Sequence, residues 1–186
     1  PYSFINLAPY VKGDNVIDVV SLECMENESS FCLVGMNSGG DDKLAYALIN
    51  LDAPDASPDF YLPMGYNEAY ILSDSKIVFT QSEARNYQSA PAVQLWEKQG
   101  VVFEVKELMP AMDDVVGVEL YPLGSNGPIV ISYFWGYEAP SREFVVLQNG
   151  ELHSYGLAVD AENNLSDLYR SCTPYFLVED QLICKQ

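Results

Sequence analysis

Four cysteines are the residues whose type and spacing most clearly predict chemistry in this chain of 186 residues. Cys24 and Cys32 stand symmetrically about residues 27–29, so a hairpin that turns there brings the two thiols side by side. Closing so small a loop contributes about 2 to 3 kcal/mol to stability, provided that the thiols stay oxidised. We therefore predict a Cys24–Cys32 disulfide and an oxidising compartment, either the periplasm or the extracellular space.

The register of this first hairpin supports the same bridge. Side chains that alternate between the faces of a ladder give the period of two that a half-buried hairpin needs, with Ser21 and Glu23 on the opposite face. The facing pairs predicted in this register are Cys24 with Cys32, Leu22 with Val34, and Val20 with Met36.

A second bridge is predicted between Cys172 and Cys184. A turn at Glu179 and Asp180 places Cys184 opposite Tyr175, so Cys172 must fold back to reach it. Four cysteines allow three connectivities, and a bridge between the first and the last strands is one alternative. Four reduced core thiols are another, whereas metal ligation is disfavoured because the chain has a single histidine and no C-x-x-C.

No common catalytic set is complete in the sequence. His153 is the single histidine, so any triad must use it, and no G-x-S-x-G nucleophile elbow occurs. Carboxylate pairs for glycoside hydrolysis can be named at will, for example Glu104 with Glu107 or Glu138 with Glu143, so their presence carries no information. We therefore expect a protein that is not an enzyme.

Oxygen-rich loops are the remaining candidates for a bound ion. Residues 37–42, and separately Asp52, Asp55 and Asp59, could bind Ca²⁺, but neither group follows the D-x-[DN]-x-[DN]-G pattern. Solvated turns are the expected explanation. No glycine-rich phosphate loop and no flavin or nicotinamide fingerprint occurs, so no cofactor is predicted.

Net charge restricts the partners of the chain. Nine basic residues against 27 acidic ones give a net charge of −18. This field repels phosphate backbones and anionic membranes, and it raises the encounter rate with basic partners. We therefore predict a basic protein partner and no nucleic acid, although the charge could also serve solubility alone. No membrane insertion is predicted, because no apolar run approaches the roughly 20 residues that cross a bilayer.

Short β-rich runs separated by turn residues must position these side chains. The clearest turn is Asn149-Gly150, which pairs Val146 with His153. The other expected turns lie at residues 74–75, 97–100, 124–127 and 179–180. This regular spacing of turns predicts an all-β fold, namely an antiparallel hairpin meander that resembles a small, irregular β-propeller. A β-sandwich and a barrel are the alternatives.

Little of the sequence predicts anything other than strands and turns. The best helix candidate is Asp160–Arg170, where Asp160 can cap the first turn. Leu51–Pro63 is predicted to be a loop, because its three prolines cannot donate to a ladder. No composition shift marks a linker, so residues 1–186 are expected to form a single all-β domain. The chain begins at Pro1, which we take as a sign that an export signal has been removed.

One aromatic-rich strand and two loops are the predicted contact surfaces. On a strand Tyr133, Trp135 and Tyr137 share one face, which is either an exposed platform or part of a dense core strand. The turn at 124–127 is a candidate plug for a partner's cleft, and segment 82–91 is a second contact. The predicted partner-binding residues are Gly124, Ser125, Asn126, Gly127, Arg85, Tyr87, Ser89, Trp135 and Tyr137.

An exported, acidic, disulfide-bonded all-β protein without a catalytic set is expected to work by binding. The leading hypothesis is a protein that inhibits another protein, such as an immunity protein that neutralises a secreted cell-wall-degrading toxin. A carbohydrate-binding or adhesion module with Trp96 and Trp135 as stacking platforms is the alternative. A carboxylate-dependent glycoside hydrolase is the second alternative.

Overall fold

The computed structural model describes residues 7, 17–25, 30–40, 42–83, 89–113, 115, 117–124, 127–135, 141–155, 173–178 and 181–185. The regular structure among them is all β-strand, and the strands pair antiparallel. The prediction of an all-β antiparallel meander is therefore confirmed. The helix predicted at Asp160–Arg170 lies outside the described residues.

The chain divides into two compact units. Unit 1 consists of Pro1–Arg85 and Ala92–Pro110, and unit 2 consists of Asn86–Pro91 and Ala111–Gln186. The single domain expected over residues 1–186 stays a prediction.

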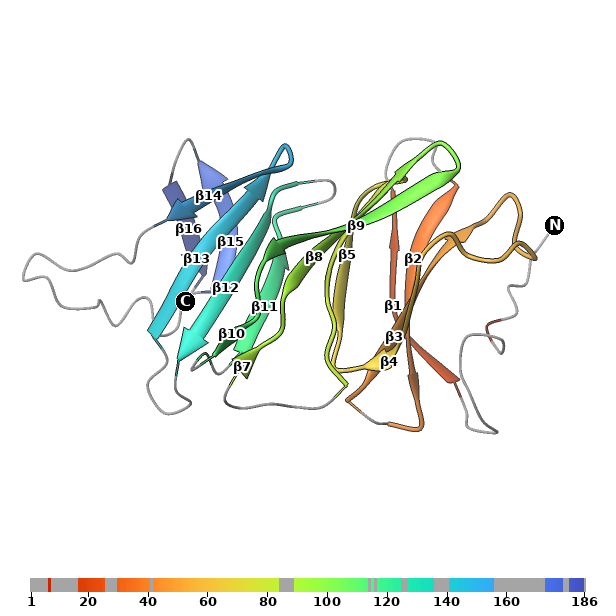
Figure 1. The fold of residues 1–186 in the computed structure, drawn as a ribbon, viewed down its shortest axis with the longest axis horizontal. Coiled ribbons are helices and arrows are strands. Elements are labelled where there is room, and N and C mark those ends of the chain that lie inside the picture. Colours follow the sequence, from red (N-terminus) through yellow and green to blue (C-terminus); the bar gives the residue numbers. More distant parts are fainter. Residues whose placement is uncertain are drawn as a thin grey trace, which may run out of the picture. The chain divides into compact units, whose positions relative to one another are not determined.

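Unit 1 contains two four-stranded sheets whose strands are ordered as they occur along the chain (Figure 1). The first sheet consists of β1 (Ile17–Cys24), β2 (Phe31–Ser38), β3 (Leu44–Asn50) and β4 (Tyr61–Gly65). The second consists of β5 (Glu68–Ser73), β6 (Lys76–Thr80), β8 (Val93–Gln99) and β9 (Val102–Met109). Both sheets are open, so the barrel alternative is wrong. Four-stranded antiparallel sheets of this kind are the blades of β-propellers.

Unit 2 contains a third sheet of the same design and two short ones. The four-stranded sheet consists of β11 (Gly117–Pro122), β12 (Ile129–Trp135), β13 (Ser141–Gln148) and β14 (Glu151–Tyr155). The two-stranded sheets pair β7 (Ser89–Ala90) with β10 (Met112–Asp113), and β15 (Thr173–Val178) with β16 (Gln181–Lys185). Four successive residues of β12, Val130 to Tyr133, are buried, so this central strand is covered on both faces.

Aromatic side chains hold the two sheets of unit 1 face to face. The Phe60 ring centroid lies 5.4 Å from that of Phe79 and 5.7 Å from that of Trp96, both in edge-to-face geometry. Such pairs add to the free energy gained by burying the rings. The rest of this core consists of Leu33, Tyr46, Leu48, Leu62, Ala69, Ile71 and Ile77. The other face of the first sheet buries Val34, Met36, Ala45, Ala47 and Ile49.

The predicted disulfide between Cys24 and Cys32 is present, with the two sulfur atoms 2.11 Å apart. Leu22 faces Val34 as predicted. Only β2 of this hairpin is buried, however, because β1 is the edge strand of the sheet. Leu22 therefore stays exposed while Val34 is buried.

The far end of this hairpin departs from the predicted register. Val19 faces Met36, whereas the sequence placed Val20 there. The shift arises from a bulge between Val19 and Ser21. The prediction was wrong because one extra residue in a strand changes the register without altering the pattern of residue types.

The other predicted hairpins form as well. Asn149 and Gly150 both have positive φ, at 53° and 83°, the conformation of the favoured two-residue hairpin turn, and Val146 faces His153 as predicted. In the hairpin β15–β16, Cys184 faces Pro174 instead of Tyr175. A bulge between Pro174 and Phe176 causes this, at a proline that cannot donate to the ladder. The predicted Cys172–Cys184 bridge involves Cys172, which lies outside the described residues.

The proline-rich loop ends earlier than predicted. Residues 51–60 form a loop, but β4 begins at Tyr61 and contains Pro63. Assigning Pro63 to the loop was wrong because β4 is an edge strand, where a missing N–H costs no ladder hydrogen bond.

The buried side chain of Asn67 joins the two sheets of unit 1. Its Nδ2 donates to the carbonyls of Leu44 and Pro63, both at 2.7 Å, and its Oδ1 accepts from the Ser82 N–H at 3.3 Å. One amide thus connects β3, β4 and the segment after β6, which requires two donors and one acceptor in one side chain.

Replacing Cys24 and Cys32 together by alanine should lower the free energy of unfolding by about 2 to 3 kcal/mol, because the unfolded chain regains the freedom of the closed loop. Urea denaturation of the oxidised proteins measures the difference. An unchanged midpoint would show that the bridge does not contribute to stability.

Asn67→Asp should cost about 3 kcal/mol or more, because a carboxylate presents only acceptors to the carbonyls of Leu44 and Pro63. Asn50→Asp is the matched control, since Asn50 Oδ1 only accepts from the Asp52 N–H at 3.0 Å and keeps this role as a carboxylate. The control should stay within about 0.5 kcal/mol of the wild type in thermal denaturation. Equal losses in the two variants would contradict the donor role of Asn67.

Candidate protein-interaction surface

The structure describes four of the nine predicted partner-binding residues. Gly124 and Gly127 lie in the turn between β11 and β12, Ser89 begins β7, and Trp135 ends β12. The other five, Arg85, Tyr87, Ser125, Asn126 and Tyr137, lie outside the described residues. The contact surface predicted from these nine residues therefore stays a prediction.

The glycines of the 124–127 turn have structural reasons to be glycine. The Gly127 N–H donates to the Gly124 carbonyl at 3.3 Å. A Cβ at Gly127 would lie 1.9 Å from the Leu123 carbonyl oxygen, a distance that no side chain tolerates. Turn geometry therefore explains these residues without a partner.

The aromatic residues proposed as exposed platforms are partly core residues. Trp96 is 2 % exposed and packs on Phe60, and Tyr133 is buried within β12. Using Trp96 as a stacking platform is therefore a wrong prediction for this residue. It failed because residue type does not tell an exposed aromatic ring from one that fills a core.

The carboxylates nominated for hydrolysis are not brought together. Glu104 and Glu107 are three residues apart on β9, so their side chains leave opposite faces of the strand. Glu138 lies outside the described residues, and Glu143 lies in β13. His153 is exposed on β14.

No described group of three or more His, Cys, Asp or Glu side chains could hold a metal ion. Two aspartates of the oxygen-rich loops are already engaged, Asp59 with the Lys98 ammonium and Asp52 with the Ser30 hydroxyl. Among the residues that the structure describes, no helix has the length and apolar character needed to cross a bilayer.

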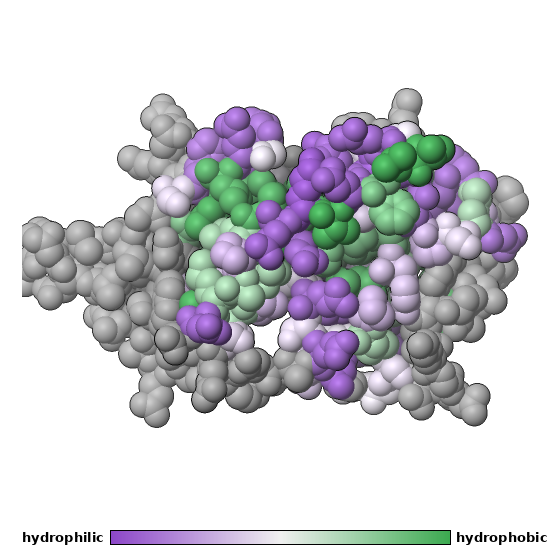
Figure 2. Space-filling model, viewed as in Figure 1, coloured by the Kyte–Doolittle hydropathy of each residue, from purple (hydrophilic) through white to green (hydrophobic). Residues whose placement is uncertain are grey.

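Hydrophobic side chains gather at the end of the hairpin formed by β8 and β9. Its tip, defined as Gly100, Val101 and Val102, carries one side chain that is 96 % exposed and one that is 65 % exposed, those of Val101 and Val102. Phe103 and Val105 follow at 64 % and 50 %. Figure 2 shows hydrophobic atoms over this end of the hairpin, among hydrophilic ones. Contiguous exposed apolar residues of this kind are typical of interaction sites.

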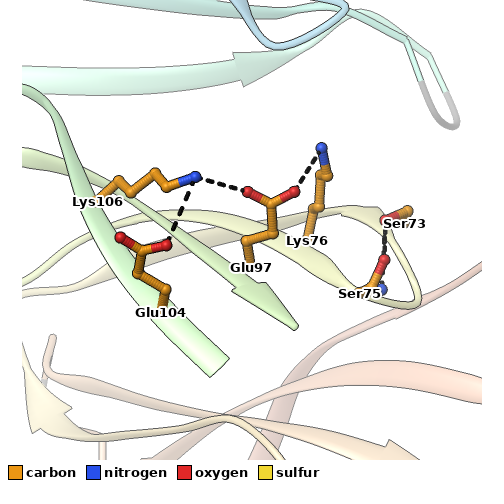
Figure 3. A network of polar contacts seen from close by, with 6 residues as sticks. All are labelled: Ser73, Ser75, Lys76, Glu97, Glu104 and Lys106. Carbon is orange, nitrogen blue, oxygen red and sulfur yellow. Dashed lines mark hydrogen bonds and ion pairs between the residues drawn. The ribbon is translucent and has the colours of Figure 1, made fainter. Parts of the chain in front are cut away.

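A row of ion pairs lies on the face of β8 and β9 that points away from the Trp96 side chain (Figure 3). Glu97 contacts the ammonium groups of Lys76 at 3.0 Å and Lys106 at 3.1 Å, and Lys106 lies 3.7 Å from Glu104. The hydrogen bonds from the two lysines hold the pKa of Glu97 below its usual value, and Glu97 raises the pKa of Lys106. The two lysines offset the repulsion between Glu97 and Glu104, which face each other on β8 and β9.

Two side chains of unit 1, Glu23 and Tyr46, have raised pKa values. The Glu23 carboxylate accepts a hydrogen bond from the Ile71 N–H at 3.3 Å, and burial raises its pKa although this bond opposes the shift. Burial, followed by the charge of Glu68, raises the pKa of Tyr46 to about 12, against a hydrogen bond from the Ala69 backbone. Because Ala69 and Ile71 belong to the edge strand β5, Glu23 and Tyr46 cover an open edge.

The hairpin tip was missed as a site by the sequence analysis. The hairpin itself was predicted, but its apolar residues were not singled out. The available signal was the run Val101, Val102 and Phe103 directly after the turn residue Gly100, where polar residues are expected.

Glu23→Gln should stabilise the protein at neutral pH relative to the wild type. A raised carboxyl pKa contributes stability below the unfolded value, near pH 4, and this contribution is lost as the pH rises through the folded value. The advantage of Glu23→Gln should therefore grow from about pH 4 to pH 7 in urea denaturation. Glu107→Gln, at an exposed residue of β9, is the control, and the same pH dependence in both variants would contradict the burial of Glu23.

Comparison with known proteins gives a likeness of fold. No family model matches the chain, and no curated protein matches it. A post-proline cleaving enzyme from Rickettsia typhi has a similar solved structure, with a TM-score of 0.59 and 16 % identity over 76 % of this chain. This chain spans 23 % of that enzyme, so the likeness concerns the fold alone.

Proposed function

We propose that this chain is a non-enzymatic, exported binding protein that inhibits another protein. An immunity protein that neutralises a secreted, basic, cell-wall-degrading toxin is the specific form of the proposal. The observation that carries it is the apolar tip of the β8–β9 hairpin, where Val101 is 96 % exposed in a protein of charge −18.

The geometry of the tip suits insertion into a cleft. A two-residue turn at Gly100 and Val101 joins two long paired strands, so the tip is presented with little freedom to lose on binding. Val101 and Val102 would enter the apolar part of the cleft, and the charged side chains of Lys98 and Glu104 would lie at the rim. This tip replaces the turn at 124–127 as the proposed plug, because it offers apolar side chains to bury.

Charge and compartment support the same function. A net charge of −18 accelerates the encounter with a basic protein, and this effect weakens as salt rises. The disulfide between Cys24 and Cys32 fits a protein that works outside the reducing cytoplasm, and we place it in the periplasm or the extracellular space.

The alternatives have less support. A carbohydrate-binding platform cannot use Trp96, because this side chain is buried in the core. A glycoside hydrolase needs two carboxylates on one face at a fixed separation, and the described pair Glu104 and Glu107 does not provide them.

Inhibition of purified basic peptidoglycan hydrolases, followed as clearing of a cell-wall suspension, tests the proposal. We expect stoichiometric inhibition of one hydrolase, and at least about tenfold weaker inhibition by Val101→Asp/Val102→Asp, since burying a valine is worth about 1.5 kcal/mol or more. Leu152→Asp, a charged substitution at an exposed residue of β14, is the matched control and should inhibit normally. Equal inhibition by both variants, or retention on glycan beads without any inhibition, would overturn the proposal.

A further inference from the structure

The outer edge of β9 presents backbone groups that no described strand uses. The Lys98 N–H donates to the Ser75 carbonyl at 2.8 Å, toward β6, so Lys98 and its partner Phe103 form a non-hydrogen-bonded pair of the β8–β9 ladder. Because such pairs alternate along an antiparallel ladder, the N–H and C=O groups of Phe103, Val105 and Glu107 all point away from β8. β9 is the last strand of its sheet, so these groups face outward.

The free stretch of β9, residues 103–107, is regular and accessible. Its pairing with β8 is continuous from Val102 to Glu107, and the register shifts only beyond it, between Val93 and Gln94 of β8. All five of its residues are exposed. A strand of this kind is a template for another extended strand.

We propose that the free stretch of β9 pairs with the same stretch of a second copy of this chain, antiparallel and centred on Val105. In this arrangement Val105 faces Val105 of the other copy, and Glu104 faces Lys106 of the other copy on both sides of the two-fold axis. Such self-complementary contacts are what a two-fold interface requires. The proposal does not rest on the inhibitory function.

Hydrogen bonding and charge select this register. The outward backbone groups belong to odd-numbered residues, so the centre on Val105 brings Phe103 opposite Glu107 and lets both exchange hydrogen bonds. Glu104 and Lys106 then form non-hydrogen-bonded pairs, whose side chains lie closer together. A centre on Glu104 or on Lys106 would set like charges directly opposite each other, which is destabilising.

Lys106 can serve both chains. Its ammonium has three donors, and two carboxylates of its own chain contact it, Glu97 at 3.1 Å and Glu104 at 3.7 Å. A Glu104 from a second copy would extend this row of alternating charges across the interface. The result would be one continuous sheet of eight strands built from two copies of the second sheet of unit 1.

The net charge of −18 on each copy opposes association, so dimerisation should depend on the salt concentration. Screening shortens the range of that repulsion to about 8 Å at physiological salt, so moderate salt should strengthen the dimer. Binding of a basic partner should respond in the opposite direction. Five paired residues bury little surface, so the dimer should be weak and reversible. Val101 lies beyond the paired stretch, so the tip stays available.

Sedimentation equilibrium of the full chain, from about 5 μM to about 0.5 mM, tests the proposal over the range expected for a small interface. We expect a reversible monomer–dimer equilibrium that shifts toward dimer between low and physiological salt. Val105→Pro should abolish it by removing the outward N–H, which is not part of the β8–β9 ladder, whereas Val105→Thr keeps this N–H and should dimerise.

Charge reversal gives a second and independent test. Lys106→Glu should abolish the dimer, and the double variant Glu104→Lys/Lys106→Glu should restore it, because opposite charges again face each other. Lys43→Glu, before β3, changes the net charge as Lys106→Glu does and should still dimerise. A monomer at all concentrations, a dimer that persists in Val105→Pro, or a double variant without rescue would each overturn the proposal. None of these outcomes depends on finding a hydrolase partner.

Discussion

Open antiparallel sheets leave two rows of backbone groups without a strand partner, and unit 1 is organised around this constraint. At β4, Pro63 removes a donor from the edge. At β5, Glu23 and Tyr46 from the first sheet receive the outward N–H groups of Ile71 and Ala69. The edge strand β1 contains a bulge, and a disulfide joins its end to β2. At β9, charged side chains are the only such device among the described residues.

Hairpins could be predicted from the sequence because their turns depend on local chemistry. Asn149-Gly150 adopts positive φ, and this alone fixes the register of β13 and β14. Bulges could not be predicted, since the sites beside Val20 and Pro174 depend on how one strand meets its neighbour. The sequence also could not show which strands lie at a sheet edge. Edge position explains why Leu22 is exposed in β1 and why β4 can contain Pro63.

The candidate surface was harder to predict than the fold. A run such as Val101, Val102 and Phe103 is compatible with a strand covered on both faces, and only the edge position of β9 leaves it exposed. Conversely, Trp96 has the residue type of a recognition platform but lies between two sheets. Burial is a property of the packed units, and periodicity along one strand does not determine it.

The connectivity of the two units has a consequence for synthesis and for dissection of the chain. Residues Asn86–Pro91 leave unit 1 to join unit 2, and Ala92–Pro110 then returns to complete unit 1. On the ribosome, all of unit 1 has emerged once Pro110 is made, whereas β7 emerges before β8 and β9 and finds its partner β10 only after them. Unit 1 can therefore mature first, with β7 still waiting for β10. A cut at a single peptide bond cannot separate them into intact modules, and exchange of either module between proteins would need at least two joined segments.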